Sequence, residues 1–360
     1  MENLNKIFIY VAIAILAVAI LGYLIFVFQK EAPRVELSYT GEELAKKIES
    51  FLAKAQKEDG SFNLFYVCSA LLEEGCLPEQ VESPLHAGQI ILAFYDLFLA
   101  TGDTAYKEKA DLGMKFVMEK CPEDPLMCEW NFFPLYVYYK DTQDPQYLEG
   151  MLSVSEKFLA DKPFFNDFVD GNTGVKLAML YDVTGDVKYR DRLDRAAEQA
   201  LNLDQVLAEN GNKLVYTVDD FAVRTRAVQT VWATLIPAYK ATGKQEYLQA
   251  SQDFFDKADT LSNLDAYDGG FAGTFALVVA VDTLTEISEL SGGVNSYLQE
   301  ARSIAQKLID EQLDTAETPK FTGDYGFLFV KLEDNSNAKG TLLTGWLVRL
   351  LLRMGGEYEL

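Results

Sequence analysis

The sequence predicts an all-α protein, a six-hairpin α/α toroid of two concentric rings of six helices, preceded by one N-terminal transmembrane helix. Three observations predict this fold. An uncharged run extends from Ile7 to Phe28, and a Thr-Gly-Asp-x-x-Tyr pattern then recurs along the chain. Each copy separates an apolar helical segment from an amphipathic one, which is typical of a helical array.

The uncharged run predicts a membrane anchor at residues 7–28, after a short tail at 1–6. At about 1.5 Å rise per residue, such a run crosses the roughly 30 Å hydrocarbon layer of a lipid bilayer. Tyr10 and Tyr23 lie near its two ends, where interfacial aromatic residues are expected. The run is longer than the apolar core of a signal peptide, so we expect an uncleaved anchor.

Residues 29–39 form a charged, proline-containing linker, and from Thr40 the helical period begins. The repeated turns are Thr101-Gly-Asp-Thr-Ala-Tyr106, Thr142-Gln-Asp-Pro-Gln-Tyr147, Thr184-Gly-Asp-Val-Lys-Tyr189, Thr242-Gly-Lys-Gln-Glu-Tyr247 and the degenerate Ser291-Gly-Gly-Val-Asn-Ser-Tyr297. In every copy except Thr142–Tyr147 a glycine ends the apolar helix, an Asp or similar residue starts the next helix, and the tyrosine packs back over the turn. Each copy therefore predicts a helical hairpin.

The contrast in polarity predicts apolar inner helices surrounded by amphipathic outer helices. The outer helices are expected near residues 40–57, 103–120, 145–161, 187–201, 245–259 and 294–313, and the inner helices near 84–100, 129–141, 168–184, 219–242, 270–290 and 338–354. Six of each close a ring, so residues 40–360 are expected to form a single toroid domain.

With these turns, and with the segments Asp59-Gly60-Ser61-Phe62 and Asp268-Gly269-Gly270-Phe271, the chain resembles the six-hairpin glycosidase-like superfamily over about residues 40–355. That superfamily includes many glycoside hydrolases, some polysaccharide lyases and sugar epimerases. The resemblance implies the toroid fold and a carbohydrate ligand. Because fold and function separate easily, it does not imply one reaction.

The loops that lead into the inner helices are expected to converge on the rim opposite the repeated turns. Glycoside cleavage needs one protonated and one ionised carboxyl group, so acids on this rim are the candidate catalytic residues. They are Glu129, Asp170, Asp219, Asp220 and Asp268. The adjacent Asp219 and Asp220 are the first choice, and some members of the superfamily that cleave mannans use neighbouring aspartates. Helix capping and pairing with an arginine are the competing structural roles.

Candidate substrate-binding residues accompany these acids. Trp130 beside Glu129 resembles a sugar subsite, although core packing is an equal alternative. Three positively charged residues lie in helices that are otherwise expected to be buried: Arg224, Arg226 and Lys176. They are therefore expected to face either the ring interior or a carboxylate. His86, the only histidine, stands where the first inner helix begins.

Tyr325 lies in the long final loop from Thr318 to Lys339, which is expected to form a lid or a hairpin over the cavity. It is a further substrate-binding candidate. A uronate lyase or epimerase would instead need a base near an arginine, and His86, Lys176 and Arg224 keep that alternative open.

The four cysteines suggest an oxidising compartment. Cys68 and Cys76 form one close pair in the sequence and Cys121 and Cys128 another, which favours disulfides and an extracytoplasmic domain. Neither spacing is typical of a zinc site, and no metal or cofactor is expected. The net charge of -23 opposes binding to nucleic acid.

Together these observations favour a membrane-anchored, extracytoplasmic glycoside hydrolase acting on a surface or environmental glycan. A catalytically inert toroid that binds glycan or supports a surface assembly is the second hypothesis.

Overall fold

The computed structural model describes residues 43, 52–53, 55–62, 65–68, 76–78, 87–159, 172–201, 228, 230–257, 271–293, 295–314, 327–331 and 337–355. The chain divides into two compact units, Met1–Glu36 and Leu37–Leu360, and every described residue belongs to the second. The expected tail, anchor and linker lie outside the described residues. Within the described ranges, no helix combines the length and the apolar character needed to cross a bilayer.

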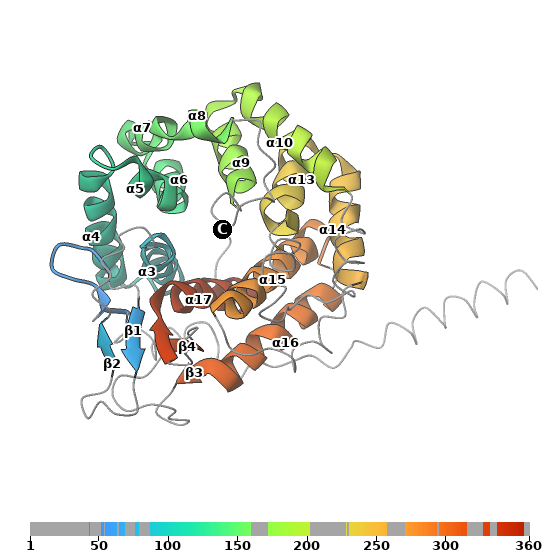
Figure 1. The fold of residues 1–360 in the computed structure, drawn as a ribbon. Coiled ribbons are helices and arrows are strands. Elements are labelled where there is room, and N and C mark those ends of the chain that lie inside the picture. The colour runs from blue at the N-terminus through green and yellow to red at the C-terminus, as the bar shows by residue number, and fades with distance from the viewer. Residues whose placement is uncertain are drawn as a thin grey trace, which may run out of the picture. The chain divides into compact units, whose positions relative to one another are not determined.

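Two rings of helices build the described part of the second unit (Figure 1). The inner helices are α3 (Gly88–Thr101), α6 (Phe132–Thr142), α9 (Thr173–Thr184), η3 with α13 (Val231–Leu235 and Ile236–Thr242), α15 (Phe271–Leu290) and α17 (Thr341–Gly355). The outer helices are α4 (Thr104–Lys120), α7 with α8 (Pro145–Ser153 and Ser155–Phe158), α10 (Val187–Ala200), α14 (Gln245–Lys257) and α16 (Asn295–Gln312).

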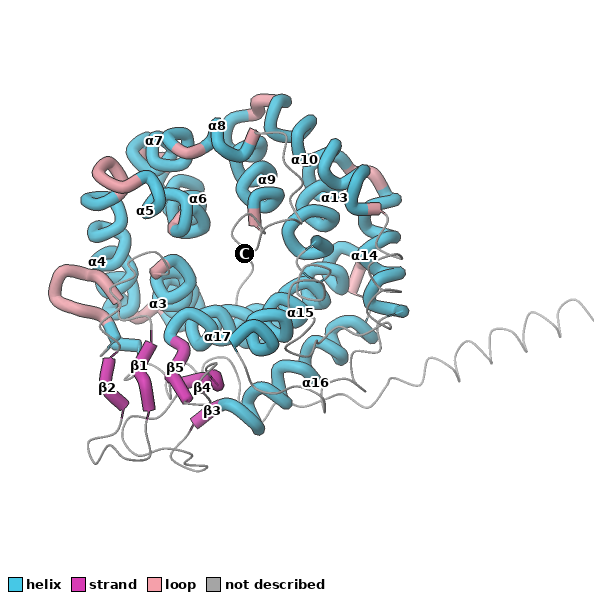
Figure 2. Tube along the Cα trace, viewed as in Figure 1, coloured by secondary structure: helices cyan, strands magenta, loops and turns pink. Residues whose placement is uncertain are grey.

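The inner ring is closed. Each inner helix contacts the next one in the chain, and the last, α17, packs against the first, α3. Figure 2 shows the same arrangement as a ring of helices around a common centre. The predicted toroid is therefore confirmed, although the first outer helix, expected near 40–57, is described only at residues 43, 52–53 and 55.

The repeated threonine stabilises each turn from both sides. Thr101 donates its hydroxyl to the carbonyl of Leu97 at 2.7 Å and accepts the backbone N–H of Asp103 at 3.2 Å. The same two bonds occur at the other copies, Thr142, Thr184 and Thr242. One hydroxyl thus satisfies a carbonyl at the end of the inner helix and an amide before the outer helix.

The aspartate and the tyrosine complete the turn. Asp103 caps α4 by accepting the N–H of Ala105 at 2.9 Å, and the later aspartates cap α7 and α10 in the same way. Tyr106, Tyr189 and Tyr247 are buried. These residues explain why the predicted helix boundaries at the turns agree with the structure.

The fourth inner helix departs from regular α geometry. Residues Val231–Leu235 form a π-helical turn immediately before Pro237. Because proline has no N–H, it cannot bond the carbonyl of Ala233. That oxygen faces Gly174 at the start of α9, where an added Cβ would lie 1.9 Å from it. The irregular turn therefore allows close contact between the backbones of α9 and η3.

A five-stranded antiparallel sheet was not predicted and adds β structure to the all-α expectation. Its order is β2-β1-β5-β4-β3, formed by β1 (Phe65–Cys68), β2 (Cys76–Pro78), β3 (Leu313–Asp314), β4 (Phe327–Lys331) and β5 (Asn337–Gly340). The strands have at most five residues, too few to show a clear period of two. The hairpin expected in the final loop is confirmed as β4 and β5.

The sheet joins the two ends of the ring. Strand β1, from the segment before α3, pairs with β5, which leads directly into α17. Cys68 and Cys76 stand directly opposite each other on β1 and β2. The second cysteine pair forms the predicted disulfide, between Cys121 and Cys128, at the connection from α4 to the short helix α5 (Pro125–Trp130).

Candidate functional site

The inner helices begin at one rim of the toroid, which we call the N-terminal rim, and end at the repeated turns, which form the turn rim. Of the predicted site residues, Glu129, Trp130 and Lys176 are described. The others lie outside the described residues: His86, Asp170, Asp219, Asp220, Arg224, Arg226, Asp268 and Tyr325. The described part of the N-terminal rim is thus built by the first turns of α3, α6, α9, α15 and α17.

Four aromatic rings meet inside the inner ring. Phe133 stacks on Trp232 with ring centroids 6.2 Å apart, and Trp232 lies 5.3 Å from Trp346. Phe275 contacts Trp346 edge to face at 5.7 Å. We call these four residues the aromatic quartet.

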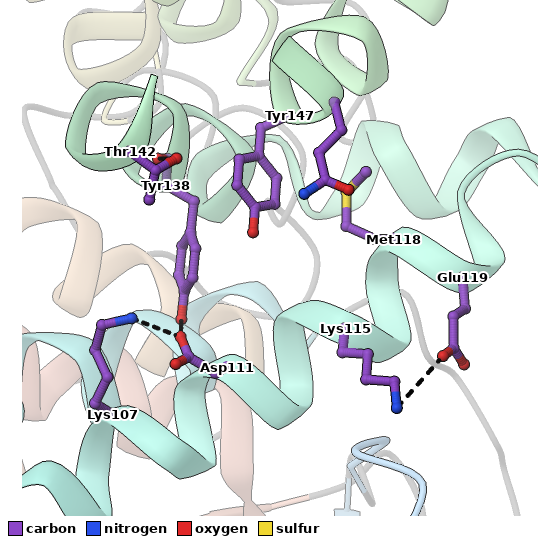
Figure 3. Close-up of a pocket in the computed structure, with 9 residues that line it drawn as sticks. Lys107, Asp111, Lys115, Met118, Glu119, Tyr138, Thr142 and Tyr147 are labelled. Atoms are coloured by element: carbon purple, nitrogen blue, oxygen red, sulfur yellow. Dashed lines mark hydrogen bonds and ion pairs between the residues drawn. The ribbon is translucent and has the colours of Figure 1, made fainter. Parts of the chain in front are cut away.

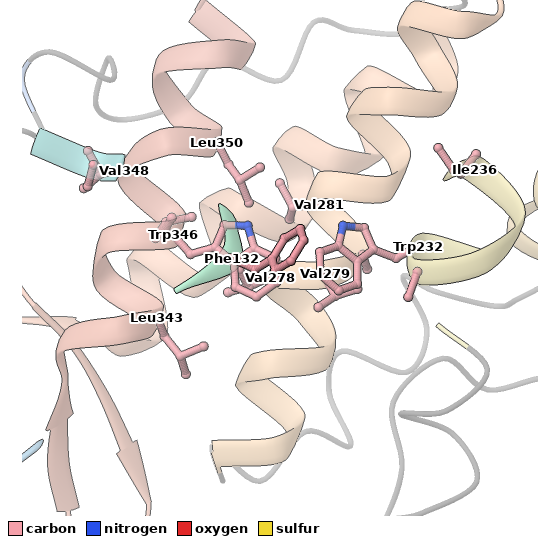
Figure 4. Close-up of a cluster of buried hydrophobic side chains, with 14 of the residues drawn as sticks. Phe132, Trp232, Ile236, Val278, Val279, Val281, Leu343, Trp346, Val348 and Leu350 are labelled. Carbon is pink, nitrogen blue, oxygen red and sulfur yellow. The ribbon is translucent and has the colours of Figure 1, made fainter. Parts of the chain in front are cut away.

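The quartet spans the ring, because its contacts join helices that are not neighbours. Phe133 is on α6 and Trp232 on η3, and α9 stands between them in ring order. Helix α15 likewise stands between Trp232 on η3 and Trp346 on α17, and Figure 4 shows both indole rings next to α15. Phe133 and Phe275, each within the first five residues of its helix, remain partly exposed. The quartet therefore forms an aromatic floor below the N-terminal rim.

One indole of this floor is held by a buried acid. The Nε1–H of Trp232 donates to Asp282 Oδ2 at 2.9 Å, and Arg353 Nη1 contacts Asp282 Oδ1 at 3.2 Å. Burial raises the pKa of Asp282, and the neighbouring carboxylate of Glu286 adds to the shift against the opposing effect of Arg353. The acid is thus held next to the quartet with its ionised form disfavoured.

The pKa of Glu286, one turn further along α15, is shifted in the opposite direction. Burial opposes its ionisation, but Lys240 and Arg353 outweigh burial and hold its pKa below the usual range. Lys240 Nζ lies 2.9 Å from Glu286 Oε1. Two carboxyl groups of which one has a raised pKa and the other a lowered pKa resemble a protonated catalytic acid and its ionised partner. Both lie on the half of α15 that leads to the turn rim, so they support the floor from below.

Further polar contacts connect successive inner helices near the turn rim. Arg349 on α17 contacts Asp96 on α3 at 2.6 Å, and Lys140 on α6 contacts Asp182 on α9 at 2.9 Å. Arg353 also contacts Glu289 on α15. Cations near helix C-termini are favoured by the helix dipole, which explains why lysine and arginine gather at these ends.

Sequence reasoning did not identify Asp282, although a signal was present. It is the first acid after the apolar run Phe275–Val281 in a helix expected to be buried. A charged residue at such a position rarely lies unpaired.

The structure brings Glu129 and Lys176 together. Lys176 Nζ lies 4.0 Å from Glu129 Oε1, and both side chains are about as buried as core residues, at 3% and 5% exposure. Lys157 Nζ contacts the other oxygen of Glu129. Lys176 also lies over the ring of Phe158 on the outer helix α8, with its nitrogen 5.1 Å from the centroid. Of the two expected environments for Lys176, the structure shows the carboxylate.

This cluster links α5, α8 and α9 and has the geometry of a structural ion pair. Each oxygen of this carboxylate faces an ammonium group, which favours a structural role for Glu129. Trp130, its neighbour in sequence, is partly exposed. Among the described residues, no group of three or more His, Cys, Asp or Glu side chains is arranged to hold a metal ion.

No protein-family model and no curated protein matches the sequence. Solved structures do match. An inactive variant of the α-1,6-mannanase GH76A of Salegentibacter sp. HEL1_6, bound to α-1,6-mannotriose, has a TM-score of 0.61 and 12% identity, covering 88% of this chain and 100% of that one. In that variant two consecutive aspartates are replaced by asparagine.

Unsaturated glucuronyl hydrolases are also similar. The enzyme of Bacillus sp. GL1, responsible for the degradation of glycosaminoglycan, has a TM-score of 0.58 and 12% identity over 87% of this chain and 94% of that one. One specific for heparin has a TM-score of 0.58 and 10% identity over 87% and 96%. These neighbours belong to the six-hairpin glycosidase-like superfamily. The predicted resemblance is thereby confirmed, and at such low identity it establishes the fold alone.

Proposed function

We propose that this protein is a membrane-anchored, extracytoplasmic glycoside hydrolase that binds a glycan at the N-terminal rim. The observation that carries the proposal is the aromatic quartet, which gathers rings from non-neighbouring helices at the centre of the toroid. Aromatic faces pack against the apolar faces of sugar rings. Of the four rings, Phe133 and Phe275 are partly exposed and are proposed to offer such faces to a sugar, whereas Trp232 and Trp346 are buried.

The proposed catalytic pair is Asp219 and Asp220. Support comes from the similar mannanase, whose inactive variant lacks two consecutive aspartates. In hydrolysis one carboxylic acid protonates the leaving oxygen, and a second, ionised carboxylate either activates water or attacks the sugar carbon. Asp170 and Asp268 remain candidate acids of the same rim, and Arg224 and Arg226 are proposed to bind acidic groups of the substrate.

The location is proposed from the chain's first segment and its cysteines. Residues 7–28 would hold the protein in the bilayer, and tethering would keep the products near the cell. The Cys121–Cys128 disulfide supports an oxidising environment for the toroid.

The test uses the full-length chain in detergent and a panel of α-mannans, neutral glycans and uronate-containing oligosaccharides. We expect hydrolysis of at least one glycan, and a loss of at least about 100-fold in kcat for Asp219→Asn or Asp220→Asn. Glu246→Gln is the matched control, because Glu246 is an exposed carboxylate on the outer helix α14. Activity unchanged in both aspartate variants would remove the pair from the mechanism. The extracytoplasmic location is tested with a substrate that does not cross the membrane. This location requires intact cells and lysed cells to hydrolyse the substrate equally well.

An inert glycan-binding toroid is the second candidate. The ion pairing of Glu129 favours it, since the one predicted rim acid that is described is occupied by two lysines. In that case glycans would bind to the full-length chain without bond cleavage, and any turnover would rule this candidate out.

A further inference from the structure

A polar groove lies on the outer face of the toroid, between α4 and α7. Its volume is about 500 Å³, within the range of small-molecule sites. Lys107, Asp111 and Lys115 on α4 form one wall, and Gln146 and Tyr147 on α7 form part of the other. Figure 3 shows the Tyr147 hydroxyl pointing into the groove opposite Asp111 and Lys115.

The repeats reveal what is unusual about this groove. The ninth residue after the turn tyrosine is Glu156, Glu198 or Asp256 in three of the outer segments, but it is Lys115 in α4. In each of the three acidic cases, the next turn along the chain supplies a donor to that acid. The donors are Lys188 Nζ to Glu156 at 3.3 Å, Lys244 Nζ to Glu198 at 3.3 Å, and the Tyr297 hydroxyl to Asp256 at 3.1 Å. A donor from one hairpin and an acid from the preceding one therefore bridge these three junctions.

At the junction of α4 and α7 both sides carry donors. Lys115 replaces the acid, and among the described residues its ammonium has only a loose contact, 3.8 Å from Glu119 on its own helix. The Tyr147 hydroxyl forms no hydrogen bond with any residue that the structure describes, whereas its counterpart Tyr247 donates to Asp194 at 2.6 Å. Burial, followed by the carboxylates of Asp144 and Asp111, raises the pKa of Tyr147, so its hydroxyl stays protonated at neutral pH.

The remaining acid on the floor of the groove is already engaged. Asp111 Oδ1 accepts from Lys107 Nζ at 2.7 Å and from the Tyr138 hydroxyl at 2.8 Å. The charges of Lys107 and Asp111 offset each other. The groove thus has an ammonium and a hydroxyl that lack the acceptor found at the other junctions.

We propose that this groove binds a uronic acid residue, whose carboxylate accepts from Lys115 and Tyr147. The partly exposed ring of Tyr147 and the side chain of Met118 supply apolar surface for the sugar ring. The site lies on the outer helices and does not depend on the proposed hydrolysis at the N-terminal rim. It would hold an acidic glycan along the outside of the toroid.

The binding test titrates the full-length chain in detergent with glucuronic acid, methyl glucoside and acetate, using ligand-observed NMR. Glucuronic acid should bind more tightly than either of the others. Lys115→Gln should weaken its binding about tenfold, and Glu119→Gln should strengthen it by removing a competing carboxylate. Lys188→Gln, the matched change at the next junction, should leave the affinity unchanged.

A charge swap gives a second test. The double variant Lys115→Glu with Gln146→Lys reproduces the Glu156–Lys188 bridge and should close the groove. We expect an unchanged circular dichroism spectrum, an equal or higher Tm, and loss of glucuronic acid binding.

The results that would overturn the proposed uronic acid groove differ from those that would overturn the proposed hydrolase activity. Affinity for glucuronic acid that is unchanged in Lys115→Gln and in the folded double variant would refute the groove, and binding would then belong to another site. Equal affinity for acetate would reduce the groove to a simple anion site, and equal affinity for methyl glucoside would refute the role of the carboxylate. Absence of hydrolysis would affect none of these outcomes.

Discussion

Asp194 illustrates how single side chains connect the hairpins. Its carboxylate accepts from Lys244 Nζ at 2.8 Å and from the Tyr247 hydroxyl at 2.6 Å, both from the next hairpin. Burial favours its neutral form, but the bonds from Lys244 and Tyr247 outweigh burial and lower its pKa. The ionised form of Asp194 is thus bound more favourably in the folded protein than in the unfolded chain.

The lowered pKa of Asp194 predicts a pH-dependent contribution to stability. A depressed folded pKa gives stability that is present above the unfolded value of about 3.9 and is lost as pH falls through the folded value. Asp194→Asn should therefore lower the Tm by roughly 1–3 °C at pH 6 and by less at pH 3. Calorimetry across pH 3–7 measures the difference. An equal loss at both pH values would show that the carboxylate charge is not responsible.

Prediction of individual site residues from the sequence had mixed success. Lys176 was expected to face either the ring interior or a carboxylate, and it lies 4.0 Å from Glu129, while its proposed role in substrate binding stays a prediction. Glu129 was proposed as catalytic because of its place before an inner helix, and that role stays a prediction although the geometry is that of an ion pair. Asp282 was missed, because its importance arises from Trp232 on another helix, 50 residues away in the chain.

The hairpin turns were the most predictable elements. Their threonine, glycine and aspartate act through bonds within a few residues, so the sequence contains the whole motif. One copy departs from it. Gln143 occupies the position of the glycine and has a φ of 57°, the left-handed conformation that glycine adopts in the other turns. A side chain in this conformation costs about 1 kcal/mol.

Gln143→Gly should stabilise the protein by about 0.5–1 kcal/mol, because glycine removes the cost of the left-handed conformation. The gain is reduced by loss of the bonds from Gln143 Nε2 to the carbonyls of Tyr139 and Lys140. Chemical denaturation of the two proteins measures the change.

The reverse substitution, Gly185→Gln, serves as the control. An added Cβ there meets no atom within 4 Å, so its cost is purely conformational, at a φ of 67°. It should destabilise by about 1 kcal/mol. If Gln143→Gly instead lowered stability, the side-chain bonds of Gln143 would outweigh the backbone cost.

The short strands and the π-helical turn were the least predictable elements. The strands are stabilised by pairing between segments far apart in the chain, such as β1 with β5. The turn depends on Pro237, which was visible in the sequence, and on the approach of Gly174, which was not.

Closure of the toroid rests on contacts between its first and last helices. Arg349 on α17 bonds Asp96 and Gln89 on α3, at 2.6 and 2.7 Å. Asp96 is only 1% exposed, so its carboxylate is paired with Arg349 inside the protein. The β1–β5 pairing joins the same two ends of the chain through the sheet.

Arg349→Met should destabilise the protein by about 3–5 kcal/mol, because it leaves Asp96 buried without its partner. Adding Asp96→Leu should recover more than half of the loss, since an apolar pair avoids the buried charge. Denaturation free energies of the two single variants and the double variant give the coupling. Additive losses would mean that the ion pair does not close the ring.

The sequence by itself determined the helical hairpins and their order, because capping bonds and apolar periodicity act over short distances along the chain, and the count of six hairpins predicted a closed ring. Only the tertiary structure decided which side chains meet: the aromatic quartet, Asp282 beneath it, the Glu129–Lys176 pair and the groove at Lys115. Their partners lie on helices that are adjacent in space but distant in the chain. The direction in which a helix presents each side chain is therefore set by packing around the ring.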